Sequence, residues 1–240
     1  MKRFKIGICL LGYQPYLDVI NKLQNYSSKL FEVTQILKIE NLPQCDYLWG
    51  YSDMCICKLL KGNNISNNDV DLRLCFINTI IQDNYFTRDL SGLDNKTVLC
   101  SFYEVEKIFN DANIDLFNYV HGIVLNELIQ IATIGCLNED FFLHDDTRHC
   151  LFDMCGEKSD IVIKHGTPKL CSACIAKIEK KAVDSEFIPL LNSELKTFKK
   201  KLFYRIVDFV KERPILSIFI TFISSILINI LSSFLYALLT

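Results

Sequence analysis

The chain has almost no net charge. Its 26 Lys and Arg residues are balanced by 28 Asp and Glu residues, which leaves a formal charge of -2. A protein that binds nucleic acid mainly through the phosphates needs a clear excess of positive charge. We therefore expect no nucleic-acid partner.

The N-terminus lacks a hydrophobic run of signal-peptide length. After Met1, Lys2 and Arg3 the apolar stretch covers only residues 4–12. Eleven cysteines could form a disulfide scaffold in a short secreted chain, but this chain is long and its cysteine count is odd. We expect the thiols to stay reduced in a cytosol.

Four of the cysteines have the spacing of a tetrahedral zinc site. Cys150 and Cys155 form a Cys-x4-Cys pair, fifteen residues follow, and Cys171 and Cys174 form a Cys-x2-Cys pair. Each pair can supply two ligands, and the spacer can bring the pairs opposite each other. Four thiolates leave no open position for water, so we predict one structural Zn2+ in a four-cysteine site. The alternative is four buried, unrelated thiols.

The C-terminal composition differs from that of the rest of the chain. Residues 215–239 carry no charge, and this length can cross a bilayer core of about 30 Å. Only Thr240 follows, so we predict a single-pass tail anchor in residues 214–240, with the lipid bilayer as partner. A buried core helix is the alternative. Lys and Arg are in excess before this segment, which predicts that the N-terminal domain is cytoplasmic.

Small and polar residues recur in the same segment at spacings of three to four. They could form a helix–helix seam and so a homo-oligomer, or their hydroxyls could bond their own backbone. They are Ser217, Thr221, Ser224, Ser225, Asn229, Ser232 and Ser233.

Residues 193–213 are predicted to form a basic amphipathic juxtamembrane helix. The alternative is a helix that packs on the domain. Its apolar face would hold Leu195, Phe198, Leu202, Phe203, Ile206, Phe209 and Val210.

Residues 1–190 predict a layered α+β domain, because strands and one early helix precede a mostly helical second half. Strands are expected at 4–11, 31–39, 54–60, 70–81 and 97–101. Helices are expected at 16–29, 104–110, 115–134 and 173–181, with Gly135 as a C-cap.

The order of these features resembles that of the archaemetzincins, zinc-dependent metallopeptidase relatives with an additional structural zinc. That family has a helical His-Glu-x-x-His, a third ligand His directly followed by Cys, a Cys-x4-Cys-x-Met segment and a final Cys-x2-Cys. His149 before Cys150 is similar to the third ligand, and the four cysteines match the structural zinc. The resemblance covers residues 4–180 and implies a mixed-sheet, metzincin-like fold; its specific part is the cysteine pattern.

The two helical histidines of that pattern are missing. Asn126 and Gln130 stand at their positions, and Glu127 keeps the position of the general base. The helix also lies farther from His149 than in the family, and the Met after the second Cys is absent. A carboxamide is a poor substitute for imidazole on Zn2+. Because Glu127 has nothing to act on without a metal, the resemblance implies a lost catalytic zinc and a pseudoenzyme.

A replacement metal site is the alternative. The segment 144–149 holds His144, His149 and two aspartates, and His121 could join them. Such a site would make the chain a membrane-bound zinc metalloprotease with a reorganised active site. The same segment is also typical of a polar turn. His165, beside Gly166, is expected in an exposed loop.

Three function classes follow from these features. The first is a membrane-anchored, cytosol-facing pseudo-metallopeptidase that acts as a sensor or adaptor and binds a peptide or protein partner in its degenerate cleft. The second is the metalloprotease. The third is a membrane effector whose anchor oligomerises and perturbs the bilayer, as in bacterial defence against phage; only the layout of the chain points to it.

Overall fold

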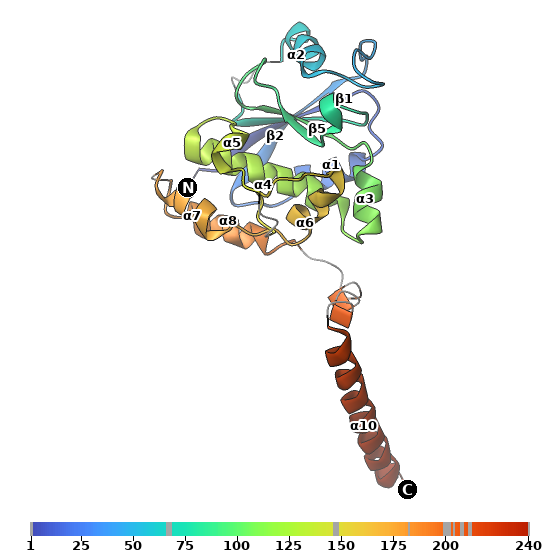
Figure 1. The fold of residues 1–240 in the computed structure, drawn as a ribbon. Helices are drawn as coiled ribbons and strands as arrows, with labels where there is room; N and C mark the ends of the chain where they lie inside the picture. The colour runs from blue at the N-terminus through green and yellow to red at the C-terminus, as the bar shows by residue number, and fades with distance from the viewer. Residues whose placement is uncertain are drawn as a thin grey trace. The chain divides into compact units, whose positions relative to one another are not determined.

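The computed structural model describes residues 2–65, 69–145, 149–181, 183–198, 203, 205–206, 209–210 and 213–239. The chain divides into two compact units, Met1–Lys199 and Lys200–Thr240. The first unit holds the sheet and helices α1 to α8, and the second holds α10 (Figure 1).

A five-stranded mixed sheet lies at the centre of the first unit, in the order β2-β1-β3-β5-β4. The strands are β1 (Phe4–Leu11), β2 (Phe31–Ile39), β3 (Leu72–Ile77), β4 (Thr87–Asp89) and β5 (Thr97–Ser101). All pairs are parallel except β4 with β5. In β1, Ile8 and Leu10 enter one core and Cys9 and Leu11 enter the other, because successive side chains point to opposite faces. The predicted α+β class is confirmed.

Helices cover both faces of this sheet (Figure 1). On one face lies α2 (Asp53–Gly62), and on the other lie α1 (Leu17–Gln24), α3 (Val105–Asp111) and α4 (Leu116–Ile134). The later helices α6 (Ile161–Gly166), α7 (Ser172–Glu179) and α8 (Phe187–Leu195) lie on the far side of α4 from the sheet, and the short α5 (Glu139–Phe142) lies beside α4. Two single-turn 3-10 helices are η1 (Gln82–Asn84) and η2 (Lys158–Asp160). Helix α4 is therefore enclosed, and nearly all its side chains are buried.

The ends of α4 follow the expectation from the sequence. Asp115 is the N-cap, and its Oδ1 accepts the backbone N–H of Phe117 at 2.9 Å. Gly135 is the C-cap in the left-handed conformation, with φ of 78°. The caps fix where α4 begins and ends, and so fix the positions of Asn126 and Gln130 along the helix.

The strand predicted at residues 54–60 is wrong, since these residues lie in α2. Ser52 caps the helix by accepting the N–H of Cys55, and Ile56, Cys57 and Leu60 form its buried stripe. This stripe has helical spacing, which the continuous apolar run concealed.

The prediction that His165 lies in an exposed loop is wrong, because this residue is buried in α6. Its ring packs against Gly122 of α4, where an added Cβ would lie 2.0 Å from the ring. Burial lowers the pKa of His165 to about 3, so the imidazole is neutral. The missing side chain of Gly122 is what lets α6 approach α4.

The start of the predicted juxtamembrane helix belongs to the globular unit. Leu195 and Phe198 are buried in the main core, and Glu194 accepts hydrogen bonds from Ser28 (2.6 Å) and Tyr26 (2.9 Å). His121 lies 3.4 Å from Glu194 and stacks on Phe198, so it is a packing residue of this cluster. Much of the remaining range to residue 213 lies outside the described residues.

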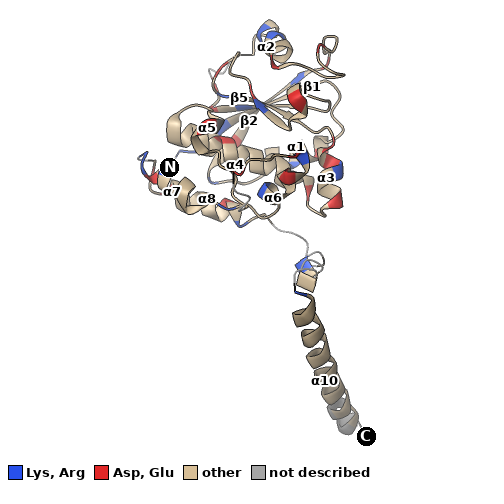
Figure 2. Cartoon of the chain, in the orientation of Figure 1, with Lys and Arg blue, Asp and Glu red and all other residues tan. Residues whose placement is uncertain are grey.

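The second unit contains one long helix, α10 (Pro214–Leu239). Residues Pro214–Ser233 are long and apolar enough to cross a membrane, with a mean hydropathy of 2.3. Figure 2 shows neither acidic nor basic side chains along the described part of α10. The hydroxyls of Thr221, Ser224 and Ser225 donate to carbonyls one turn back. For these three residues the structure therefore shows the second of the two predicted arrangements, in which the hydroxyl bonds the backbone of its own helix.

Candidate functional site

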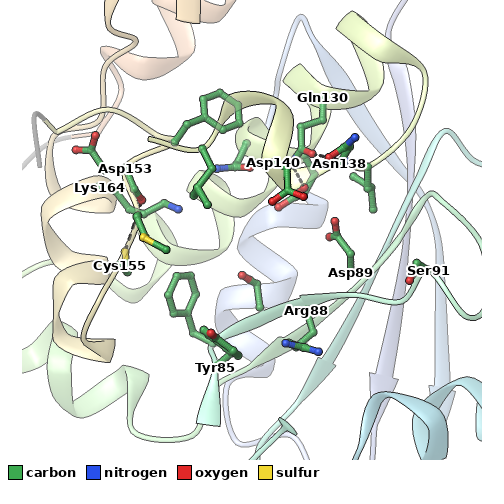
Figure 3. Close-up of a pocket in the computed structure, with 18 of the residues that line it drawn as sticks. Tyr85, Arg88, Asp89, Ser91, Gln130, Asn138, Asp140, Asp153, Cys155 and Lys164 are labelled. Atoms are coloured by element: carbon green, nitrogen blue, oxygen red, sulfur yellow. Dashed lines mark hydrogen bonds between the residues drawn. The ribbon is translucent and has the colours of Figure 1, made fainter. Parts of the chain in front are cut away.

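A cavity of about 500 Å³ lies between α4, β4 and the segment that carries the first cysteine pair (Figure 3). Helix α4 contributes Asn126, Glu127 and Gln130 to its wall, and the edge strand contributes Arg88 and Asp89. The sequence places the three helical residues in one turn, and the fold places that turn at a cavity. The two amides and the acid, which the sequence resemblance sets beside the family's catalytic motif, therefore share one wall of this cavity.

The two carboxamides are engaged in hydrogen bonds. Asn126 Nδ2 donates to the carbonyl of Leu151 at 2.7 Å, and Gln130 Nε2 donates to Asn126 Oδ1 at 3.2 Å and to Glu127 Oε2 at 2.6 Å. Gln130 Oε1 accepts the N–H of Asn138 at 2.7 Å. Both side chains are buried, so these bonds satisfy polar atoms that water does not reach.

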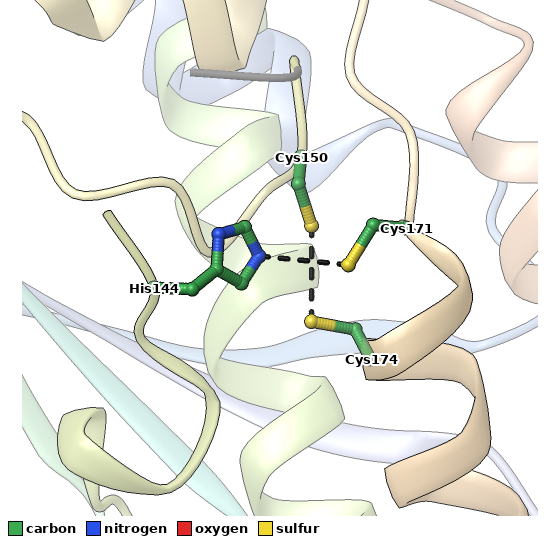
Figure 4. A group of neighbouring side chains, drawn as sticks. All are labelled: His144, Cys150, Cys171 and Cys174. Atoms are coloured by element: carbon green, nitrogen blue, oxygen red, sulfur yellow. Dashed lines mark hydrogen bonds between the residues drawn. The ribbon is translucent and has the colours of Figure 1, made fainter. Parts of the chain in front are cut away.

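A second group of polar side chains can hold a metal ion. It consists of His144, Cys150, Cys171 and Cys174, whose ligand atoms all lie within 4.8 Å of one another (Figure 4). Cys171 is the N-cap of α7 and Cys174 lies in its first turn, so the Cys-x2-Cys pair faces one direction. The backbone of Cys150 pairs with Lys169, and that of His144 pairs with Asp153. These pairings bring the separate segments together.

The separations fit a tetrahedral zinc. With Zn–S of about 2.3 Å and Zn–N of about 2.1 Å, tetrahedral angles give about 3.8 Å between two sulfurs and about 3.6 Å between sulfur and nitrogen. Cys150 Sγ lies 3.8 Å from Cys174 Sγ, and His144 Nε2 lies 3.6 Å from Cys171 Sγ. Three thiols and one imidazole are also a donor set that Zn2+ prefers. We conclude that this group is a zinc-binding centre.

The surroundings favour the thiolate at Cys150. The pKa of Cys150 falls to about 5, first because the Cys174 thiol hydrogen-bonds to it and then because backbone N–H groups and His144 face it, while burial acts in the opposite direction. The same hydrogen bond, together with burial, raises the pKa of Cys174, so Cys174 is the donor of the pair. Asp153 lies behind the centre: its Oδ1 is 3.2 Å from His144 Nδ1, and its Oδ2 accepts the N–H of Cys150 at 3.0 Å. The sequence did not predict that Asp153 contacts the metal group, because this contact depends on how the loop folds.

Two predicted ligands lie elsewhere. Cys155, predicted as the fourth thiolate, is not in the group; its Sγ lies 3.9 Å from the carbonyl oxygen of Asp153, and it lines the cavity. His149, a candidate for a second metal, is exposed and its Nδ1 lies 3.3 Å from the carbonyl of Ile163. His144, the other candidate for a second metal, belongs to the thiol centre instead. Residues 146–148 of the same predicted loop lie outside the described residues.

The position of His144 explains why the structure differs from the predicted four-cysteine site. Its backbone N–H donates to the carbonyl of Phe152, and its carbonyl accepts the N–H of Met154. This short pairing turns the histidine toward the cysteines. The signal available in the sequence was only that a histidine lies six residues before Cys150.

Comparisons with known proteins give a fold likeness. No family model matches the chain, and no curated protein sequence matches it. A solved structure of an archaemetzincin from Methanopyrus kandleri is similar with a TM-score of 0.49 and 17% identity, over 75% of this chain and 95% of that one. An archaemetzincin from Archaeoglobus fulgidus, complexed with malonate, is similar with a TM-score of 0.46 and 17% identity, over 72% of this chain and 99% of that one. The solved structures to which this chain is similar are thus members of the family that its cysteine pattern resembles.

Proposed function

We propose that this chain is a membrane-anchored pseudo-metallopeptidase: a domain with one structural zinc whose cavity binds a partner without hydrolysing it. The observation that carries the proposal is the hydrogen-bonded pair of Asn126 and Gln130. Each amide is bonded to protein groups, and neither brings the basicity that a zinc ligand needs. The zinc at His144 and the three cysteines is structural, because four protein ligands leave no position for water.

The lining of the cavity suggests the chemistry of the ligand. Two bases line it, Arg88 and Lys164, and Arg88 Nη2 is held at 2.6 Å by Asp53. The acids outnumber them: Asp89, Asp94, Glu127, Asp140 and Asp153. A positively charged group is therefore favoured over an anion. We propose a peptide segment or protein partner with a basic side chain, as a sensor or adaptor would bind.

The second unit supplies the anchor in this proposal. In this proposal α10 crosses the bilayer, which its length and apolar composition allow, and the Lys and Arg excess between residues 196 and 213 supports a cytoplasmic zinc domain. Asn229 and the serines near it remain available for a homo-oligomeric contact between spans. A membrane effector would use the same parts.

The alternative is a membrane-bound zinc metalloprotease with a reorganised site. Glu127 favours it, since a carboxylate at the wall of a cavity could act as a general base if a second metal were bound. Zinc analysis of the detergent-solubilised full chain distinguishes the two. We expect one zinc per chain and no hydrolysis of unstructured peptides; two zincs with peptidase activity would replace our proposal by the alternative.

Fractionation of cells tests the anchor. A chain that ends after Phe198 keeps α8 intact and should move from the membrane to the soluble fraction. A chain that ends at residue 190 is the matched control: it lacks Glu194 and its bonds to Ser28 and Tyr26, and should be less stable. Membrane sedimentation of the folded 1–198 chain would show that α10 is not what attaches the protein.

A further inference from the structure

We infer that the fourth zinc ligand is His144 and that Cys155, the second cysteine of the Cys-x4-Cys pair, is a free thiol on the cavity wall. The inference deepens the proposed function, because it rests on the structural zinc proposed there. It departs from the four-cysteine site that the sequence pattern implies, and it assigns separate roles to the two cysteines of one pair.

Four donors already lie at the centre. His144 Nε2 and the sulfurs of Cys150, Cys171 and Cys174 lie within 4.8 Å of one another, and two of their separations, 3.8 Å and 3.6 Å, are those of a tetrahedral zinc. A structural zinc takes four ligands. Since these four complete the coordination, Cys155 would have to displace His144 in order to bind.

A carboxylate supports the ring of His144 from the side away from the thiols. Zinc-bound histidines almost always present the second ring nitrogen to a carboxylate, a carbonyl or water, which fixes the ring orientation and raises its basicity. His144 Nδ1 faces Asp153 Oδ1 at 3.2 Å while Nε2 faces the thiols. Asp153 is nearly fully buried, and its second oxygen caps the N–H of the ligand Cys150. This arrangement is that of a supported ligand.

The side chain of Cys155 points to the cavity and not to the metal group. Figure 3 labels it among the cavity-lining residues, beside Lys164, whereas Figure 4 draws the metal group without it. The chain between Cys150 and Cys155 folds back so that Met154 N–H bonds to the carbonyl of His144. The fold therefore brings His144 to the centre and turns the sulfur of Cys155 to the cavity.

A cobalt-substituted full chain in detergent tests the assignment. Co2+ takes the place of Zn2+, and each coordinated thiolate adds to the sulfur-to-cobalt charge-transfer absorption. We expect Cys155→Ser to leave this absorption and the bound metal unchanged, and His144→Ala to weaken metal binding at least tenfold in competition with a chelator. Asp153→Asn, which keeps an acceptor for the Cys150 N–H, should weaken binding by roughly 10-fold to 100-fold.

Alkylation of the zinc-loaded chain provides an independent readout. Cys155 should be modified by a small maleimide while Cys150, Cys171 and Cys174 stay protected, with the exposed Cys45 as the positive control. A loss of about a quarter of the charge-transfer absorption in Cys155→Ser, or a failure of that variant to fold, would assign Cys155 to the metal and overturn the inference. A full chain that binds no zinc or cobalt would overturn both this inference and the structural zinc of the proposed function, whereas metal bound through Cys155 would overturn the inference alone.

Discussion

The thiol centre and the amide cluster of α4, Asn126 with Gln130, meet at the adjacent residues Cys150 and Leu151, and they differ in what satisfies their polar atoms. Asn126 bonds to the carbonyl of Leu151, and the neighbouring Cys150 faces the metal group. In the amide cluster the side chains satisfy one another and the backbone. In the thiol centre three sulfurs and one imidazole nitrogen lie within 4.8 Å of one another, and the 3.8 Å between Cys150 Sγ and Cys174 Sγ fits a zinc ion between them. In the proposed function, hydrogen-bonded amides stand in place of a catalytic metal site, whereas converging thiols and an imidazole hold the structural zinc.

The largest expected effect is on the thiol centre. Cys174→Ser should release the zinc and unfold the domain, because structural zinc binding contributes of order 10 kcal/mol and is coupled to folding. Zinc content and thermal unfolding measure it, with Cys45→Ser as the exposed, matched control. An unchanged melting temperature in Cys174→Ser would mean that the thiol centre does not stabilise the fold.

The reverse experiment introduces two histidines at the positions of the amides. Asn126→His with Gln130→His removes the bonds to the carbonyl of Leu151 and from the N–H of Asn138. The buried carbonyl of Leu151 left unpaired should cost about 1–3 kcal/mol, and the N–H of the exposed Asn138 less. We expect no tightly bound second zinc, since His149 is not among the described residues that line the cavity. Metal analysis after gel filtration checks this. A second zinc retained by the variant would show that the cleft can still assemble three ligands.

Acid should weaken the packing of α6 on α4 independently of the metal. The pKa of His165 is about 3 in the folded chain and near 6.5 when unfolded, so the unfolded state binds the proton first and stability falls as the pH drops through this window. Between pH 7 and pH 5 the loss is about 2 kcal/mol.

Denaturant unfolding of the wild type and of His165→Asn at both pH values isolates this term. Asn at this position does not titrate, and zinc release affects both proteins alike. If the two proteins lose the same stability between pH 7 and pH 5, the buried imidazole is not the acid-sensitive group.

The smallest expected effect is at Glu127. Glu127→Gln keeps an oxygen that can accept from Gln130 Nε2, so stability should change by about 1 kcal/mol or less and cellular function should persist. Activity and unfolding of the variant are compared with the wild type. A folded Glu127→Gln chain that has lost its function would contradict the non-enzymatic proposal.

Much of the fold followed from local pattern. The strands β1, β2 and β5 and both ends of α4 lie where apolar runs and capping residues predicted them, because these signals act over neighbouring residues. The apolar helix α10 likewise follows from composition alone. The helix α2 was missed because a stripe within a nearly continuous apolar run fits a strand as well as a helix.

The candidate site was only partly predictable. The spacing of the cysteines predicted a zinc centre. The amides at Asn126 and Gln130 predicted that no catalytic zinc is bound, since residue type determines which atoms can bind a metal. Whether His144 or Cys155 completes the centre was decided by tertiary structure, because the pairing of residue 144 with residue 153 depends on the loop's path and not on spacing. The same holds for His165, whose burial depends on Gly122 in a helix more than forty residues earlier. Sequence alone thus determined which donors exist, and the fold decided which of them meet.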